Sequence, residues 1–429
     1  MTPDGRPPST GRDSPSGRLP PADHSAAGAV HRSPAGSPAS PSAGPSAGSA
    51  ELVSLIRAEI ESSPDGRITF ARYMERALYE PELGYYRSAA DRPTDAGDFL
   101  TAPETHAIFG WTLARRIESL WAELGRPRPF QLIEYGAGSG TLALSILDGF
   151  RRHGATGLLD AVRCEPVESN PHRLADLRER FETAGLAGSL GPAGSPAIGS
   201  VPVVGVILAN EFLDAMPVRR VVVLGGKLRE LFVTWSAGSG DADAAGRGGE
   251  AAGGFTEVAA EPSTLELAAR LEDDAVELAE GQVAEISLGL APWLDEVSAR
   301  LDRGFVLAID YGYEAAELYG PRRLAGSLLG YRGHRAETDP FAAPGLTDLT
   351  AHVDFTAVQR LAAARGFRTV SLTTQSELLV AAGLEEELLA LQASPDLTLA
   401  NYTRARSGIV RMLDPRHMGR FRVLLLSRS

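Results

Sequence analysis

Phe130-Gln-Leu-Ile-Glu-Tyr-Gly-Ala-Gly-Ser-Gly-Thr141 is the segment of this 429-residue chain that indicates its fold most strongly. Its first half is an apolar run that predicts a strand, and its second half is a glycine-rich turn. The turn leads into a helical run marked by Leu142, Ile146 and Phe150. Glycine permits unusual φ values and lets a ligand approach where a Cβ would clash. Strand, glycine turn and helix in this order predict a site for a nucleotide-like cofactor.

The spacing of the three glycines narrows the kind of cofactor. Gly136, Gly138 and Gly140 form GxGxG, whereas the dinucleotide fingerprint places its third glycine or alanine one position later, at Thr141. This spacing favours S-adenosylmethionine over NAD. A tight corner that binds nothing is the alternative.

Short strand-like runs alternate with helical runs on both sides of this stretch. The predicted strands are 131–135, 162–167, 203–209 and 305–310. Such alternation predicts βαβ units, a parallel sheet and ligand binding at the carboxyl ends of its strands. A hairpin over 220–224 and 228–234 interrupts the pattern, and we expect the low-complexity run 236–254 after it to be disordered.

The remaining chain is predicted more coarsely. Residues 50–124 read as helical around a loop at 91–100, and the apolar spacing over 109–124 predicts a helix packed on a sheet. After residue 310 we predict a polar loop that extends to residue 348, followed by a helix at 355–365 and a strand at 369–373. A helical stretch then continues to about residue 397, and a last strand covers 421–427.

The N-terminal fifty residues differ in composition from the rest. They contain ten Pro, ten Ser and seven Gly, and their only large apolar residues are Met1, Leu19 and Val30. Burial of so little apolar surface cannot offset the conformational entropy that the chain loses on folding. We therefore expect residues 1–50 to be disordered.

Charge and cysteine content exclude several classes of protein. The formal net charge of −13 argues against nucleic acid as a partner. A single cysteine, Cys164, excludes an intramolecular disulfide and a cysteine-based zinc site. The sequence contains no apolar run long enough for a membrane span and no signal-peptide pattern, so we expect no membrane partner and a cytoplasmic location.

Acidic and amide side chains follow two of the predicted strands. Glu168, after the second strand, is placed to accept hydrogen bonds from ribose hydroxyls; Glu165 is its rival, and a solvated loop carboxylate is the alternative for either. After the third strand, Asn210 can donate and accept, while Glu211 and Asp214 supply acceptors for a nitrogen or guanidinium substrate. Alternatively, Asp214 caps a helix and Glu211 is merely exposed.

Several blocks in order resemble the MidA-like family of S-adenosylmethionine-dependent methyltransferases, which includes the mitochondrial complex I assembly-factor methyltransferase. The blocks are Ile68–Met74, Tyr79–Tyr86, Gly97–Glu104, the GxGxG turn, Asn210–Val218, Asp310–Gly312, Tyr331–His334 and Asp348–Phe355. The resemblance spans roughly 68–367. It implies an α/β fold with a Rossmann-like, seven-stranded class I methyltransferase sheet in domain 126–429, a helical N-terminal cap at 51–125 and a central insertion.

The resemblance also implies the cofactor and the substrate class. S-adenosylmethionine would contact Gly97, Asp98, the GxGxG turn with Glu134 before it, and Glu168. The mitochondrial relatives methylate an arginine of a complex I subunit, so a protein arginine is the implied substrate. A cofactor-binding assembly factor with little turnover is the alternative function.

Methyl transfer to a guanidinium needs carboxylates that hold it and take a proton. We predict Glu211, Asp214 and Asn210 as catalytic residues, with Glu104 and Asp98 behind them. His334 and His352 lie in polar loops without metal-ligand spacing, so no metal is expected; Asp310 is either a structural cap or a cleft residue.

Overall fold

The computed structural model describes residues 47–88, 101–191, 201–237, 253–333, 335–395 and 397–429. These belong to one unit that spans residues 45–429. The predicted disordered tail and low-complexity insertion lie almost wholly outside the described residues, as do Gly97, Asp98 and His334. No helix in the described ranges is both long and apolar enough to cross a bilayer.

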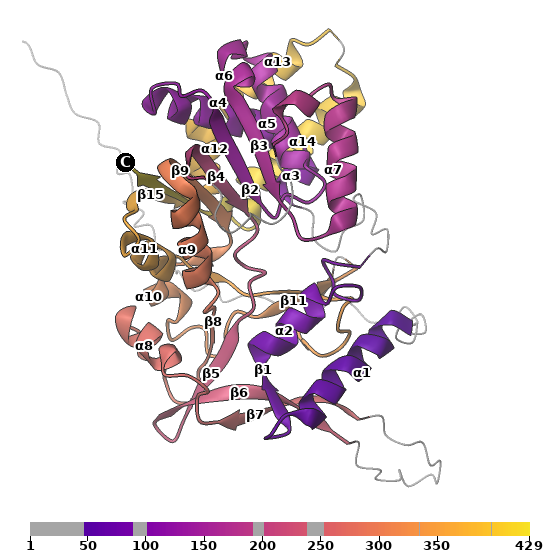
Figure 1. Ribbon diagram of the computed structural model, residues 1–429, viewed down its shortest axis with the longest axis vertical. Helices are drawn as coiled ribbons and strands as arrows, with labels where there is room; N and C mark the ends of the chain where they lie inside the picture. Colours follow the sequence, from indigo (N-terminus) through magenta and orange to yellow (C-terminus); the bar gives the residue numbers. More distant parts are fainter. Residues whose placement is uncertain (1–46, 89–100, 192–200, 238–252, 334, 396) are drawn as a thin grey trace, which may run out of the picture. The chain divides into compact units, whose positions relative to one another are not determined.

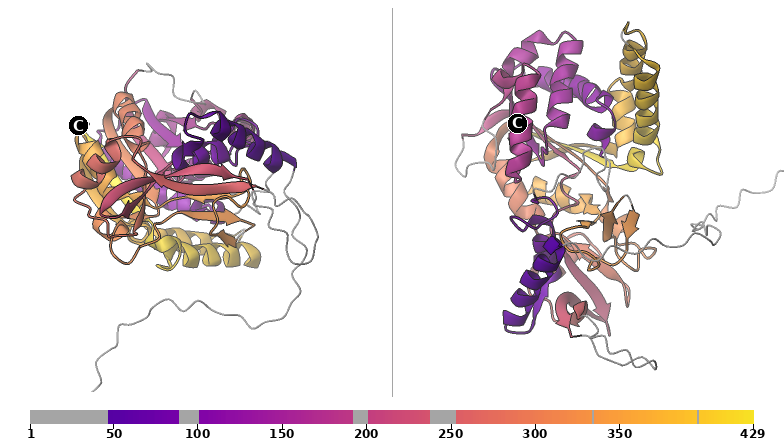
Figure 2. Two further views of the ribbon diagram at one scale, coloured as in Figure 1. Left: turned by 90° about the horizontal axis from the view of Figure 1, so that it is seen from below. Right: turned by 90° about the vertical axis from the view of Figure 1, so that its right-hand side faces the viewer.

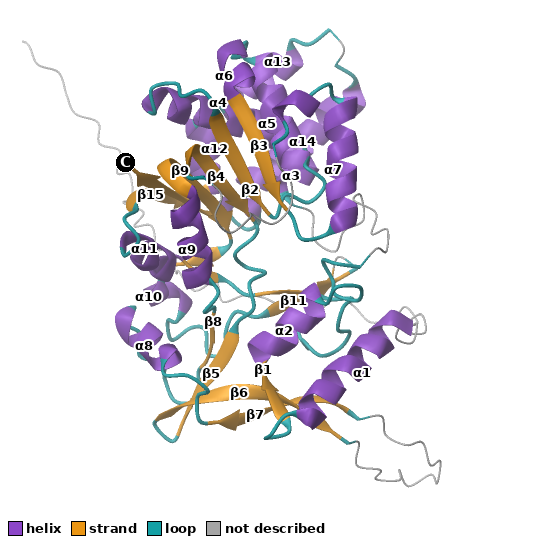
Figure 3. Ribbon diagram, in the orientation of Figure 1, coloured by secondary structure: helices purple, strands orange, loops and turns teal. Residues whose placement is uncertain are grey.

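The main sheet has six strands in the order β15-β16-β9-β4-β2-β3 (Figures 1 and 3). Its strands are β2 (Phe130–Tyr135), β3 (Val162–Val167), β4 (Val203–Asn210), β9 (Leu301–Asp310), β15 (Arg368–Thr374) and β16 (Arg422–Arg428). β3, β2, β4 and β9 are parallel, whereas β16 is antiparallel to both β9 and β15. The predicted parallel core is therefore present.

The predicted count of seven strands differs from what the described residues show. At the outer edge of β3, only a single parallel bridge joins Cys164 to Leu190. Leu190 directly follows the 3-10 helix η2 (Ala187–Ser189), and residues 192–200 lie outside the described ranges. The sheet is thus a mixed six-stranded sheet with an isolated bridge at its edge.

Alternate side chains of each central strand pack into two separate hydrophobic cores, one on each face of the sheet. Leu132 of β2 packs on one face and Ile133 on the other, as the twofold period of a strand requires. The first face carries α4 (Ile108–Glu123), α5 (Thr141–Arg152), α6 (Thr156–Ala161), α7 (Pro171–Thr183), α12 (Gln375–Ala381), α13 (Leu384–Gln392) and α14 (Leu399–Leu413). The second face carries α9 (Leu290–Arg300) and α11 (Phe355–Ala363). Of the C-terminal helices, yellow in Figure 2, α12 and α13 lie beside α4, and α14 contacts α12.

A second, antiparallel sheet lies between β4 and α9 in the sequence and takes in one N-terminal strand. Its strands are β1 (Arg67–Thr69), β5 (Arg219–Leu224), β6 (Lys227–Ser236), β7 (Gly254–Ala260) and β8 (Val283–Ile286). The predicted hairpin is β5 and β6, and α8 (Glu266–Asp273) follows β7. Residues 50–124 are therefore not wholly helical, because β1 pairs with β6 in this sheet.

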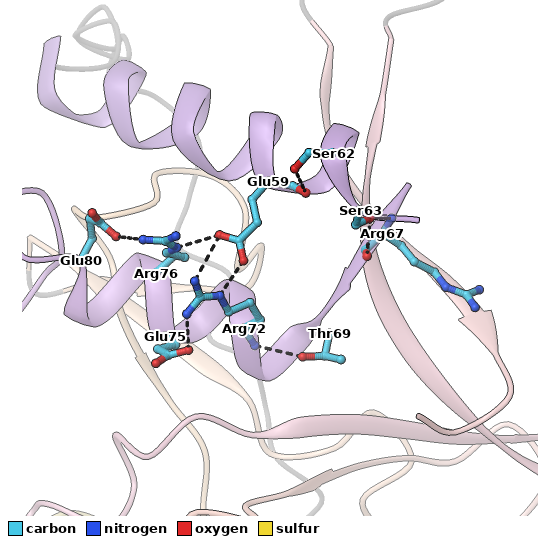
Figure 4. Close-up of polar contacts among 9 residues, drawn as sticks. All are labelled: Glu59, Ser62, Ser63, Arg67, Thr69, Arg72, Glu75, Arg76 and Glu80. Carbon is cyan, nitrogen blue, oxygen red and sulfur yellow. Dashed lines mark hydrogen bonds and ion pairs between the residues drawn. The ribbon is translucent and has the colours of Figure 1, made fainter. Parts of the chain in front are cut away.

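Helices α1 (Ala47–Ser62) and α2 (Phe70–Tyr79) pack on this second sheet. Figure 4 shows how they are joined: the Glu59 carboxylate accepts from Arg72 Nε at 2.6 Å and from Arg76 Nε at 2.8 Å. The Thr69 side chain caps α2 by accepting from the Arg72 N–H. These contacts fix α2, whose last residue is Tyr79.

The predicted polar loop 311–348 contains structure of its own. It holds β10 (Gly312–Tyr313), α10 (Ala315–Leu318), β11 (Leu329–Arg332) and β12 (Arg335–Glu337), and β13 (Asp348–Thr350) and β14 (Val353–Asp354) follow. β11 pairs with β12 and β13, and β10 pairs with β14. The short helix α3 (Ala102–Thr105) lies within the region predicted as helical, whereas α14, which is followed by the 3-10 helix η3 (Met418–Arg420), was not predicted.

Candidate active site

The glycine turn after β2 is built on three left-handed residues. Gly136, Gly138 and Gly140 have φ of 69°, 53° and 78°, which residues with a Cβ rarely adopt. A Cβ on Gly140 would lie 2.9 Å from Cγ of Leu177, so this glycine also lets α7 pack against the turn. A Cβ on Gly138 would meet nothing within 4 Å, which leaves its backbone open to a ligand.

A cavity of about 590 Å³ opens over this turn, at the carboxyl ends of β2, β3 and β4. Its size is that of a typical small-molecule site. Seven of the predicted site residues line it: Glu134, Gly136, Gly138, Glu168, Asn210, Glu211 and Asp214. Gly140 does not line it and acts through packing, while Gly97 and Asp98 lie outside the described residues.

Glu168 is joined directly to the glycine turn. Its Oε2 accepts from the N–H of Gly138 at 2.9 Å, and its Oε1 accepts from the N–H of Asn170 at 2.7 Å. The rival, Glu165, instead pairs with Arg300 and does not line the cavity. The geometry therefore favours Glu168 over Glu165 for a ribose.

Glu134, the second-last residue of β2, lies just before the turn and is 5% exposed. Burial raises its pKa to about 8; the Ala143 N–H opposes this shift, and the charge of Glu168 adds to it. Its Oε2 has no hydrogen-bond partner among the described residues. A buried carboxylate oxygen without a partner marks a place where a ligand donor fits.

The loop after β4 presents Glu211 to the other end of the cavity. Glu211 has φ of 50°, and its N–H donates to the Ile309 carbonyl at 2.8 Å. Its Oε1 accepts from the N–H of Ala102 and from Nδ2 of Asn210, both at 3.2 Å. Burial, followed by the charge of Asp214, raises the pKa of Glu211 to about 8. Its Oε2 lacks a hydrogen-bond partner in the described part of the chain.

Asp310, left open as cap or cleft residue, is a cap for this loop. Its Oδ2 accepts from the N–H groups of Phe212, Leu213 and Asp214 at 3.1, 2.8 and 3.3 Å. Its Oδ1 accepts from the N–H of Tyr311 at 2.9 Å. One fully buried carboxylate thus holds the loop that carries Glu211 and Asp214.

Three tyrosines and an aspartate, to which the sequence analysis gave no role, line the same end. The Tyr79 hydroxyl donates to the Ala215 carbonyl at 2.9 Å, and the Tyr86 hydroxyl donates to Oδ1 of Asp348 at 2.6 Å. The Tyr79 and Tyr86 rings stack with centroids 5.5 Å apart. Burial raises the pKa of Tyr79, Tyr86 and Tyr311, so all three hydroxyls stay protonated.

Other candidate residues take different places. Glu104 lines the cavity, but its Oε2 accepts from the N–H and the hydroxyl of Thr101 in a capping box. His352 lies outside the cavity lining, and burial, followed by the charges of Arg323 and Arg420, lowers its pKa to about 4. Among the described residues, no group of histidine, cysteine and acidic side chains is arranged to hold a metal ion.

In the sequence, these tyrosines were indicated only by the longer segments that resemble the family. Tyr79–Tyr86 and Asp310–Gly312 were among the segments that resemble the family, yet nothing in their local pattern points to a cavity. Their hydroxyls reach the site through long-range contacts, such as Tyr86 with Asp348 across 262 positions. Pattern analysis of single segments does not detect such contacts.

Comparisons with known proteins agree with this geometry. Residues 112–373 match a family described as "Putative S-adenosyl-L-methionine-dependent methyltransferase". A Burkholderia thailandensis protein solved with S-adenosyl-homocysteine is 33% identical, with a TM-score of 0.76 over 89% of this chain and 93% of that one. The Drosophila melanogaster protein named "Protein arginine methyltransferase NDUFAF7 homolog, mitochondrial" is 29% identical over 87% of this chain and 84% of its own length.

A Danio rerio protein named "Protein arginine methyltransferase NDUFAF7, mitochondrial" is also 29% identical, over 77% of this chain and 76% of its own length. The family match covers more than half of the chain. The site agrees with it, because the glycine turn and Glu168 lie together at the carboxyl ends of the parallel strands, where folds of this kind bind nucleotide-like cofactors. The chain belongs to the MidA-like family of S-adenosylmethionine-dependent methyltransferases.

Proposed function

We propose that this protein transfers a methyl group from S-adenosylmethionine to an arginine side chain of another protein. The observation that carries the proposal is the charge of the cavity end opposite the glycine turn. Glu211, Asp214 and Asp348 line it, and the one arginine or lysine among the described lining residues, Arg173, lies on α7, which packs against the glycine turn. Glu211 and Asp214 each have a buried carboxylate oxygen without a hydrogen-bond partner in the described part of the chain, so this end of the cavity favours a cationic acceptor.

The two ends of the cavity would bind different molecules, the cofactor at one end and the acceptor at the other. The open turn at Gly138 and the carboxylate of Glu168 would hold the nucleoside part of the cofactor. When bound, S-adenosylmethionine supplies a methyl carbon on a positively charged sulfur that leaves as a neutral thioether. At the other end, the planar guanidinium of an arginine would donate several N–H groups to the carboxylate oxygens, which accept them.

The carboxylates of the loop after β4 perform the acid–base step. A protonated guanidinium is a poor nucleophile, so a base must take one proton as the nitrogen–carbon bond forms and the carbon–sulfur bond breaks. Glu211, with a pKa raised to about 8, and Asp214, with a pKa raised to about 6, are basic enough to accept it. Asn210 fixes the rotamer of Glu211 through its amide.

The relatives named as protein arginine methyltransferases support the acceptor class. A complex I subunit as the acceptor, and the cytoplasm as the location, stay predictions. The cap boundary at residue 125 also stays a prediction. In the structure, α4 within the predicted cap packs on the main sheet.

The proposal is tested with Glu211→Gln and Asp214→Asn, which preserve shape and remove the base. Each variant is expected to lower labelled methyl transfer into protein by about 10² or more, while S-adenosylhomocysteine affinity stays near that of the parent. Glu179→Gln, on the exposed side of α7, is the control and should change neither.

Wild-type transfer from both variants would refute the catalytic roles. A wild-type protein that binds S-adenosylhomocysteine but methylates no protein in an extract would refute the enzyme. It would instead favour a cofactor-binding assembly factor.

A further inference from the structure

The C-terminal segment 399–420, which comprises α14 and η3, has a charge opposite to that of the rest of the chain. It contains five arginines, Arg404, Arg406, Arg411, Arg416 and Arg420, and a single acidic residue, Asp414, in a protein of net charge −13. Asp414 is paired with Arg416 at 2.8 Å. The other four arginines are exposed and form no salt bridge with any described residue. We call residues 399–420 the arginine segment.

The arginine segment runs beside the cavity. Gly408 of α14 packs on α3, since a Cβ there would lie 2.9 Å from Cγ2 of Thr105. α3 lines the cavity through Pro103 and Glu104. Arg404 and Arg411, four residues before and three residues after Gly408, lie next to it on the helix surface. The middle of the segment therefore lies at the α3 rim.

The C-terminal end of the segment lies near the acidic end of the cavity. Phe421, the residue after Arg420, packs against Tyr311 with the ring centroids 5.2 Å apart. Tyr311 lines the cavity together with Asp214 and Asp348. The segment thus extends from α3 to the acidic end of the cavity.

The exposed face of α14 also carries apolar side chains. Leu399 is 81% exposed and Val410 is 60% exposed. They lie between Arg406 on one flank and Arg404 and Arg411 on the other when the helix is projected down its axis. Exposed arginines around large apolar residues are typical of a surface that contacts another protein.

We propose that the arginine segment binds an acidic stretch of the acceptor protein, whose neighbouring arginine enters the cavity. This inference rests on the proposed function and adds where the acceptor docks and what its sequence contains. A polypeptide can carry both an acidic run and a cationic side chain. Nucleic acid and anionic bilayers carry only one sign, and the net charge of −13 and the carboxylates of the cavity oppose their approach.

The docking surface is tested by binding, independently of methyl transfer. The probe is a fluorescent Glu-Gly repeat peptide without arginine, titrated onto the full chain with S-adenosylhomocysteine. Arg404→Gln/Arg411→Gln is expected to weaken binding about tenfold, and binding should weaken as salt increases. The control Arg303→Gln/Arg368→Gln removes the same charge at exposed positions of β9 and β15 and should leave the affinity unchanged.

Methylation kinetics supply a second measurement. Two arginine peptides are compared, one flanked by glutamates and the other by glutamines. The first should have a KM about tenfold lower at equal kcat, and Arg404→Gln/Arg411→Gln should abolish this difference.

Equal binding by the parent and Arg404→Gln/Arg411→Gln would overturn the docking surface. So would stronger binding of duplex DNA or phosphatidylserine vesicles than of the acidic peptide. Arginine-dependent binding without methyl transfer to either peptide would instead refute the proposed function and leave the surface intact.

Discussion

Asp310→Asn tests how the loop after β4 is held. The carboxylate accepts four backbone N–H groups, three at Oδ2 and one at Oδ1. An amide has one oxygen, so with that oxygen at the Oδ2 position its NH₂ group faces the N–H of Tyr311. One buried donor then lacks an acceptor, at a cost of about 1–3 kcal/mol, and three hydrogen bonds lose their charge assistance. Relief from burying a charge offsets part of this, so we expect a net loss of about 2–3 kcal/mol.

The functional consequence of Asp310→Asn follows from the groups that the loop carries. Misplacement of Glu211 by about 1 Å is expected to lower kcat about 10²-fold, while the glycine turn keeps its affinity for S-adenosylhomocysteine. Urea unfolding gives the free energy, and labelled methyl transfer gives kcat. Asp302→Asn, an exposed position of the same strand, is the control and should change neither value. Asp310→Asn with parental stability and parental kcat would refute the reasoning.

Three further predictions concern the cavity. First, because the pKa values of Glu211 and Asp214 are raised to about 8 and about 6, a cationic acceptor must displace protons as it binds; acceptor KM should fall as pH rises from 6 to 8, and a KM that is constant or rises would contradict this. Second, Gly140→Ala places a Cβ on a residue with φ of 78° against a neighbouring side chain; we expect about 1–3 kcal/mol lower stability and weaker S-adenosylhomocysteine binding by calorimetry, and parental values would show that the turn tolerates a side chain. Third, Tyr86→Phe removes the 2.6 Å hydrogen bond to Asp348; acceptor KM should rise about tenfold with little change in cofactor affinity, and an unchanged KM would exclude this pair from acceptor binding.

The parallel core was predictable because its signals are local. The apolar runs of β2, β3, β4 and β9 and the helices between them correspond to the strands and helices in the structure, and the three glycines sit in the left-handed conformations that their spacing suggested. Glu168 was preferred over Glu165, and the structure places Glu168 against the turn. Strand ends differ from the predicted ends by four residues at most, at the start of β9.

The remainder depended on contacts between distant segments. The strands within 311–348 are short, and β11 is held between β12 and the more distant β13 rather than in a pattern of its own. α14 buries only Ala405, Gly408 and Met412, so its sequence lacks a strong apolar period. The role of Asp310 could not be decided, because four N–H donors from other positions define it.

We infer that the acidic end of the cavity serves arginine methylation. The direct measurement is incubation of the purified enzyme with tritiated S-adenosylmethionine and extract from a strain that lacks the protein, followed by hydrolysis and amino-acid analysis of the labelled protein. The expected result is label in methylated arginine, absent with Glu211→Gln. Label confined to another amino acid, or no label from a protein that binds S-adenosylhomocysteine, would contradict the claim.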